Sequence, residues 1–109
     1  MTRQDVATMV ASIGLPYAYY QFSEDTAQPC PFICFYYTGS DDMSADNINY
    51  AKVERLVIEL YTDEKDFTNE DAVAAVLNSY GLFFTKSEVY IATERMYETI
   101  FESEVILNG

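Results

Sequence analysis

Apolar and polar residues alternate along Tyr50–Thr62, and this stretch predicts the central strand of a small sheet. Leu56, Ile58 and Leu60 fall on one face and make that face apolar over residues 56–60. The other face is mixed, because it carries Val53, Arg55, Val57, Glu59 and Tyr61. A strand with one fully apolar face needs a covering layer. We therefore expect a helix to lie across Leu56, Ile58 and Leu60.

A first helix is predicted over residues 3–13. Its apolar residues recur three and four positions apart, as in a helix with one buried stripe; they are Val6, Met9, Val10 and Ile13. Thr2 and Asp5 have the spacing of a shortened capping box at its start. Gly14 is expected to end it as a left-handed residue, and Pro16 prevents it from resuming.

The second predicted helix follows the central strand and is the one expected to cover it. Thr68 is expected to be its N-cap, with Asp71 three residues later, and Phe67 is expected to pack on Ala72 as a hydrophobic staple. Gly81 ends the pattern. The expected buried face consists of Ala72, Val73, Val76, Leu77 and Tyr80.

Four further strands are predicted, over residues 17–23, 32–38, 82–91 and 95–107, with a loop at 24–31 and a turn at 92–94. In the last strand, one face carries Tyr97, Phe101, Val105 and Leu107, and the other carries Met96, Glu98, Ile100, Glu102, Glu104 and Ile106. We therefore predict one α+β domain over residues 1–109. It has a mixed, mostly antiparallel sheet of about five strands and two helices, one packed across the sheet.

Residues 39–47 (GSDDMSADN) form the most conspicuous predicted loop. Asp41, Asp42 and Asp46 surround Met43 in a composition that disfavours regular structure. The fixed ligand spacing, central glycine and distant glutamate of a calcium loop are absent. We expect a solvated hairpin loop, or one that becomes ordered against a partner. Its candidate assembly or lumen residues are Asp41, Asp42, Met43 and Asp46.

Acidic residues outnumber basic ones by 18 to 6, for a net charge of −12. This balance argues against an ordinary nucleic-acid binder, which needs a basic patch. Three readings remain open: the acid keeps the chain in solution, it mimics DNA, or it lines a passage through which DNA slides without being held.

Catalytic motifs are missing from the sequence. The chain has no histidine, and its four glycines do not form a phosphate-binding loop. Cys30 and Cys34 are too far apart along one extended segment to form a disulfide, and two cysteines alone do not complete a zinc site. We predict no catalytic residue, metal or cofactor. We expect neither a signal peptide, since Met1 leads directly into the first helix, nor a membrane-spanning segment.

Several segments of the chain are characteristic of a fold and carry no chemistry. They are the capped helix, residues 14–20 (GLPYAYY), residues 31–37 (PFICFYY), Ala45-Asp46-Asn47 with Tyr50 close behind, residues 57–66 (VIELYTDEKD), Tyr90-Ile91 and residues 94–101 (ERMYETIF). In these segments, which extend over nearly the whole chain, the sequence resembles the small neck proteins of long-tailed phages and prophages of Gram-positive bacteria, in the tail-terminator or tail-completion class.

This resemblance implies a structural subunit, not an enzyme, in a hexameric homo-oligomer ring. The ring would cap the tail tube protein, meet the head-connector or neck protein, and let DNA pass without specific binding or membrane contact. It would be located in the tail–head neck of the virion, and in the host cytoplasm during assembly. An alternative is an acidic inhibitor or DNA mimic that binds a host nucleic-acid-binding protein. Another is a small-molecule-binding module built on Tyr17, Tyr19, Tyr20, Tyr36 and Tyr37.

Overall fold

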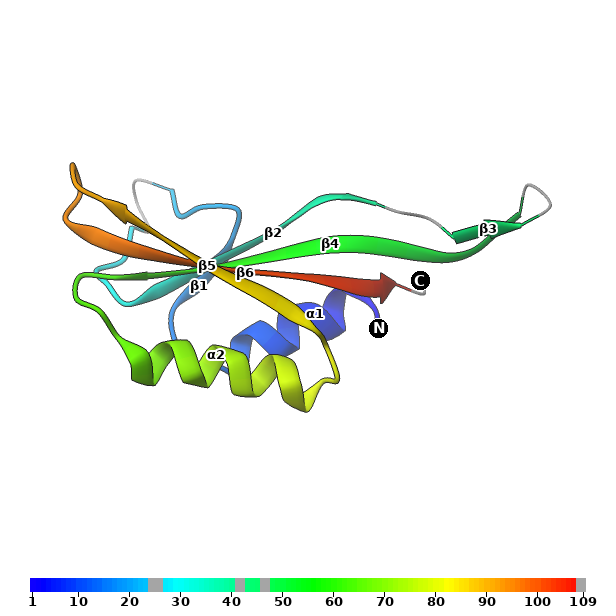
Figure 1. Cartoon of the computed structure of the whole chain (residues 1–109), viewed down its shortest axis with the longest axis horizontal. Coiled ribbons are helices and arrows are strands. Elements are labelled where there is room, and N and C mark those ends of the chain that lie inside the picture. Colours follow the sequence, from blue (N-terminus) through cyan, green and yellow to red (C-terminus); the bar gives the residue numbers. More distant parts are fainter. Residues whose placement is uncertain (24–26, 41–42, 46–47, 108–109) are drawn as a thin grey trace.

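The computed structural model describes residues 1–23, 27–40, 43–45 and 48–107. Within these ranges, two helices and six strands follow one another (Figure 1). They are α1 (Arg3–Ala11), β1 (Tyr17–Tyr19), β2 (Phe32–Ser40), β3 (Met43–Ala45), β4 (Ile48–Thr62), α2 (Phe67–Ser79), β5 (Phe84–Ile91) and β6 (Met96–Leu107).

The sheet has the strand order β1-β2-β4-β6-β5, so β4 lies at its centre, as predicted for Tyr50–Thr62. β4 is antiparallel to β2 on one side and to β6 on the other, and β5 is antiparallel to β6. β1 runs parallel to β2 and makes the sheet mixed. The predicted class, a mixed and mostly antiparallel α+β sheet with two helices, is confirmed.

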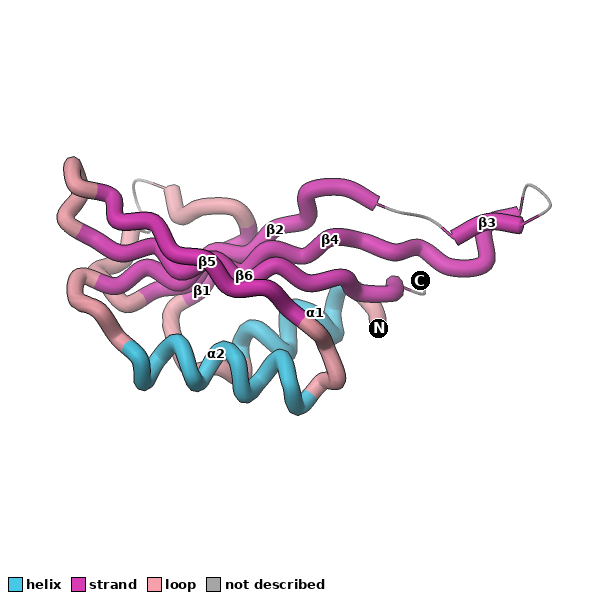
Figure 2. The backbone as a smooth tube through the Cα atoms, viewed as in Figure 1, coloured by secondary structure: helices cyan, strands magenta, loops and turns pink. Residues whose placement is uncertain are grey.

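Both helices lie on the same side of the sheet (Figures 1 and 2). Leu56, Ile58 and Leu60 are buried beneath them, as the alternation in β4 predicts. The sequence assigned this role to one helix, and α1 also contributes to the core. The buried cluster joins Val6, Met9 and Val10 of α1, Val73 and Leu77 of α2, and Ile33, Phe35, Leu56, Ile58, Leu60, Phe101, Val105 and Leu107 of the sheet.

The start of α1 is the predicted capping box. The Asp5 amide donates to Thr2 Oγ1 at 3.1 Å, and the Thr2 amide donates to Asp5 Oδ2 at 2.8 Å. Two otherwise unpaired amides of the first turn are thereby satisfied. The helix ends at Ala11, two residues earlier than expected, and Gly14 follows with a φ of +91°.

The predicted N-cap of α2 is wrong. Asp66, not Thr68, caps the helix, and its Oδ1 accepts from the Asn69 amide at 3.0 Å. A carboxylate at this position also interacts favourably with the helix dipole, so it takes the role from the neighbouring threonine. Phe67 becomes the first helical residue and is 64% exposed, so it does not form the expected staple on Ala72. Tyr80 lies beyond the helix and is exposed.

Glu70 is a buried charge that the sequence did not indicate as such. It lies on the same helical stripe as Val73 and Leu77 and is almost fully buried. Lys65 and Lys86 contact its two carboxylate oxygens at 2.6 and 2.8 Å, and Lys65 also pairs with Glu88. Burial alone would raise the pKa of Glu70, but the hydrogen bonds from both lysines outweigh it and lower the pKa. These ion pairs tie the first turn of α2 to β5.

Several predicted strand and loop boundaries need correction; β5, for example, begins at Phe84 and not at residue 82. The first predicted strand, residues 17–23, stops at Tyr19, because Tyr20 takes a left-handed φ of 70°. The predicted loop at 39–47 is wrong for the described residues within it: β2 continues to Ser40, and Met43–Ala45 forms β3, which pairs with the beginning of β4. Backbone pairing with β4 therefore overrides the turn-forming composition. β3 and the beginning of β4 extend away from the helices (Figure 2).

Replacement of Ile58 tests the position of the core. Ile58 is 1% exposed, so Ile58→Ala removes buried apolar volume and should lower the free energy of unfolding by about 2–5 kcal/mol. Val89 is 47% exposed on β5, and Val89→Ala is the control, expected to cost less than about 1 kcal/mol. Urea denaturation measures both values. Equal losses would show that β4 does not lie over the core.

Candidate functional site: the open face of the sheet

The face of the sheet opposite the helices, here called the open face, carries the main polar cluster of the described residues. The strand register aligns its side chains in rows that cross β2, β4 and β6. These rows are Phe32–Tyr61–Glu98, Cys34–Glu59–Ile100 and Tyr36–Val57–Glu102. The mixed face predicted for β4 and the acidic face predicted for β6 therefore form one surface.

Glu59 and Glu98 are diagonal neighbours on this face and share a hydrogen bond. Burial is the main cause that raises the pKa of Glu59, and the hydrogen bond with Glu98 and the charge of Glu98 raise it further, to about 8. The Tyr61 hydroxyl donates to Glu98 Oε2 at 3.0 Å. At neutral pH the pair therefore retains a proton, because two adjacent carboxylates in a partly dry site repel each other.

The groups around this pair also hold their protons. Burial and the charge of Glu59 raise the pKa of Cys34 to about 11, and the same two causes raise the pKa values of Tyr36 and Tyr61. A thiol with so high a pKa is a poor nucleophile. The site is thus a hydrogen-bonded cluster in which the thiol and the phenols are protonated and the carboxyl pair shares one proton, and it has no activated nucleophile.

A cavity of about 490 Å³ opens beside this cluster. Phe32 and Tyr61 stack on its wall with ring centroids 4.9 Å apart, and Tyr20 packs on Tyr36 at 5.4 Å. The segment after β1 contributes further lining residues, including Phe22. Half of the residues that line the cavity are aromatic, and Glu59 of β4 contributes a carboxyl group.

The five tyrosines proposed as one binding cluster are divided between the two faces. Tyr20 and Tyr36 line the cavity on the open face. Tyr19 packs on Phe35 and Tyr37, and Tyr37 belongs to the rim of the helix-covered core. Tyr17 and Tyr19 are exposed at the edge of the sheet. The five residues therefore do not surround a single ligand site.

The carboxylates of β6 divide into two groups. Glu98 is partly buried in the pair with Glu59, whereas Glu102 and Glu104 are exposed on the open face. Residues 99, 101, 103, 105 and 107 of the same strand are buried, so the predicted alternation is confirmed. Among the loop candidates, Asp41, Asp42 and Asp46 lie outside the described residues, and Met43 begins β3.

The described residues contain neither a metal centre nor a membrane-spanning helix. Residues 1–23, 27–40, 43–45 and 48–107 contain no group of three or more His, Cys, Asp or Glu side chains able to hold a metal ion. Neither α1 nor α2 is long and apolar enough to cross a membrane. Cys30 and Cys34 are both free thiols.

The Glu59–Glu98 pair is the feature that sequence reasoning missed. The alternation in β4 and β6 placed each residue on a mixed face. Their proximity depends on the β4–β6 register, which aligns Tyr61 with Glu98. A one-residue shift of that register would place Glu98 on the other face, so the strand patterns alone could not identify the pair.

No known protein family matches the chain, and no curated protein is similar to it in sequence. Among solved structures, the fold is similar to that of a chain in the virion of a native gene transfer agent (GTA) particle. The TM-score is 0.53 and the sequence identity 19%, and the match covers 92% of this chain and 85% of that chain. At this identity the likeness establishes a common fold, and it extends over nearly the entire chain.

The raised pKa of Glu59 predicts a pH dependence of stability. The folded chain keeps a proton on Glu59 that the unfolded chain releases near pH 4.5, so this contribution is present below about pH 4.5 and is lost as the pH rises through about 8. Glu59→Gln keeps a neutral hydrogen-bonding side chain. Its Tm should therefore decline less than that of the wild type between about pH 5 and pH 8. Glu102→Gln, an exposed control on the same face, should keep the wild-type slope; a wild-type slope in Glu59→Gln would refute this role.

Proposed function

We propose that the chain is a structural protein of a phage-like virion and forms a ring at the junction between tail and head. The observation that carries the proposal is the fold shared with a gene transfer agent virion chain over 92% of this chain. The resemblance of the sequence to tail-terminator and tail-completion proteins agrees with it. In this role the subunit acts by binding other proteins and needs neither a catalytic residue nor a cofactor.

The proposed ring is a homohexamer with one face on the tail tube protein and the other on the head-connector or neck protein. Identical subunits close into a ring when each one uses two unlike surfaces to contact its two neighbours. The subunit is made in the host cytoplasm and ends in the neck of the virion. The proposal distinguishes this chain from a DNA mimic, which would act as a single subunit on a host protein.

Deletion of the gene in the phage or prophage that encodes the chain tests the proposal. We expect filled heads and separate tails to accumulate, because a neck ring is needed to join them. Supplying the wild-type chain in trans should restore joined particles, as counted by electron microscopy and plaque titre. Normal joined particles in the deletion strain would contradict a neck function.

Net acidity fits the passage of DNA through such a ring. DNA binds proteins largely through counterion release on cationic side chains, and an acidic lumen offers no such contact. We propose that Asp41, Asp42 and Asp46 face the lumen. The carboxylates of β6 are then left for other contacts.

Charge reversal tests the lumen assignment. In the proposed lumen position these side chains face solvent, where charges contribute little to stability. Lysine at positions 41, 42 and 46 together should therefore leave the Tm nearly unchanged, but should slow DNA ejection or block tail joining. The control is Asp63→Lys, Glu64→Lys and Glu94→Lys, which makes the same charge change at exposed positions outside residues 39–47. Ejection at the normal rate from virions that carry the triple variant at positions 41, 42 and 46 would exclude these aspartates from the lumen.

A further inference from the structure

Exposed tyrosines line one edge of the sheet, here called the tyrosine edge. Tyr17, Tyr19 and Tyr20 are 43%, 54% and 63% exposed, although each ring also packs on an aromatic neighbour of β2. β1 is the outermost strand on this side, so its outer backbone edge has no partner strand among the described residues. Residues 17–20 (YAYY) bear no charge. Exposed aromatic groups of this kind are typical of protein interfaces.

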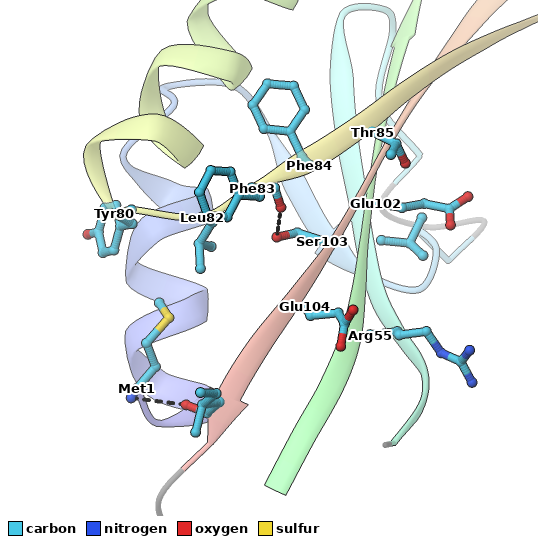
Figure 3. A pocket seen from close by; sticks show the side chains of 13 residues that line it. Met1, Arg55, Tyr80, Leu82, Phe83, Phe84, Thr85, Glu102, Ser103 and Glu104 are labelled. Carbon is cyan, nitrogen blue, oxygen red and sulfur yellow. Dashed lines mark hydrogen bonds between the residues drawn. The ribbon is translucent and has the colours of Figure 1, made fainter. Parts of the chain in front are cut away.

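A second exposed apolar surface, here called the Phe83 corner, lies where β5 begins at the opposite edge. Phe83 is 94% exposed, Ile106 55% and Tyr80 42%. They line a cavity of about 670 Å³ together with the carboxylates of Glu102 and Glu104. In Figure 3, Tyr80 and Leu82 lie on one side of β6 and Glu102 on the other. Exposed rings that are grouped with other apolar side chains around a cavity, as here, are characteristic of binding surfaces, whereas single exposed rings are not.

The end of β5 leaves part of β6 accessible at this corner. β5 pairs with β6 only as far as Ser103, whose hydroxyl donates to the Phe83 carbonyl. Within the described residues, no strand lies beside the outer edge of residues 104–107; the Ile106 carbonyl accepts from the Met1 amine at 3.2 Å. The corner therefore combines an exposed aromatic ring and apolar side chains with carboxylate acceptors, and the Arg55 guanidinium, on the residue opposite Glu104, also lines the cavity.

The two surfaces are complementary in chemistry. Phenol hydroxyls on the tyrosine edge can donate to the acceptor-only carboxylates of Glu102 and Glu104, and the tyrosine rings can pack on Phe83. Two copies that each carry a charge of −12 repel one another, and the repulsion is smallest where one of the contacting surfaces is uncharged. The tyrosine edge meets that condition. A second copy of this chain is therefore the partner that supplies the matching surface.

We infer that the tyrosine edge of one subunit docks into the Phe83 corner of the next, which makes a head-to-tail contact. The strand order places the two surfaces at opposite edges of one sheet, so each subunit can contact two neighbours at once. Unlike surfaces repeated in this way generate closed rings or filaments. The inference rests on the proposed ring and identifies the surfaces that build it.

Two variants that each disrupt one surface test the contact by sedimentation velocity. Phe83→Asp keeps the tyrosine edge, and Tyr19→Asp keeps the corner. Each alone should weaken self-association at least about thirtyfold, as expected for removal of a central aromatic anchor. An equimolar mixture should form dimers and nothing larger, because one intact surface remains on each variant. Phe67→Asp and Tyr90→Asp are the controls, since Phe67 and Tyr90 are 64% and 52% exposed outside both surfaces.

Three results would overturn the inference: a wild-type chain that stays monomeric at about 1 mM, variants that associate like the wild type, or a mixture that stays monomeric. Circular dichroism verifies that each variant is folded. If either variant is unfolded, oxidative cross-linking replaces the sedimentation experiment. A double variant with Tyr19→Cys and Phe83→Cys in the same chain should give a ladder of disulfide-linked oligomers. A double variant with Tyr19→Cys and Phe67→Cys should not. Absence of the ladder would then reject the contact.

The outcomes for the contact and for the proposed function are separable. If the chain is required for tail joining but the mixed variants do not dimerise, the docking assignment fails and the neck function stands. If the mixed variants dimerise but particles form normally without the chain, the contact stands and the neck function fails.

Discussion

The structure depends on a core that is covered on one side only. Both helices pack on the face of the sheet that carries Leu56, Ile58 and Leu60, and buried side chains from α1, α2 and the sheet fill the layer between them. The open face of the sheet is therefore in contact with water, because neither α1 nor α2 covers it. It is stabilised by stacked aromatic rings and by a carboxyl pair that shares a proton, and it leaves carboxylates of β6 exposed.

This arrangement suits a subunit that is completed by its neighbours. The sheet keeps exposed aromatic side chains at two opposite edges, at β1 and at the beginning of β5. An isolated chain must solvate both surfaces, whereas a ring of identical chains buries each against the other. The acidic surface of the chain remains compatible with such a ring. In each contact the tyrosine edge bears no charge, so the two acidic subunits repel each other less there.

Periodicity predicted most of the fold because the strands and helices bury one face each. The alternation in β4 and β6 and the stripe on α2 correctly identified Ile58, Phe101 and Val73 as core residues. One error arose between two neighbouring capping residues, and another where strand pairing overrode a local composition. Asp66 replaced Thr68 as a cap, and pairing with β4 made a strand of Met43–Ala45. The Glu59–Glu98 pair depends on strand register, which no single strand pattern specifies.

A cryo-electron microscopy map of the virion that carries this chain would show directly whether the chain forms a ring in the neck. We expect a closed ring of copies of this chain between the tail tube and the head connector. In that ring, Tyr19 of each subunit should lie beside Phe83 of the next, with residues 39–47 toward the DNA channel. Absence of the chain from the particle, or its presence as isolated copies away from the neck, would contradict the account.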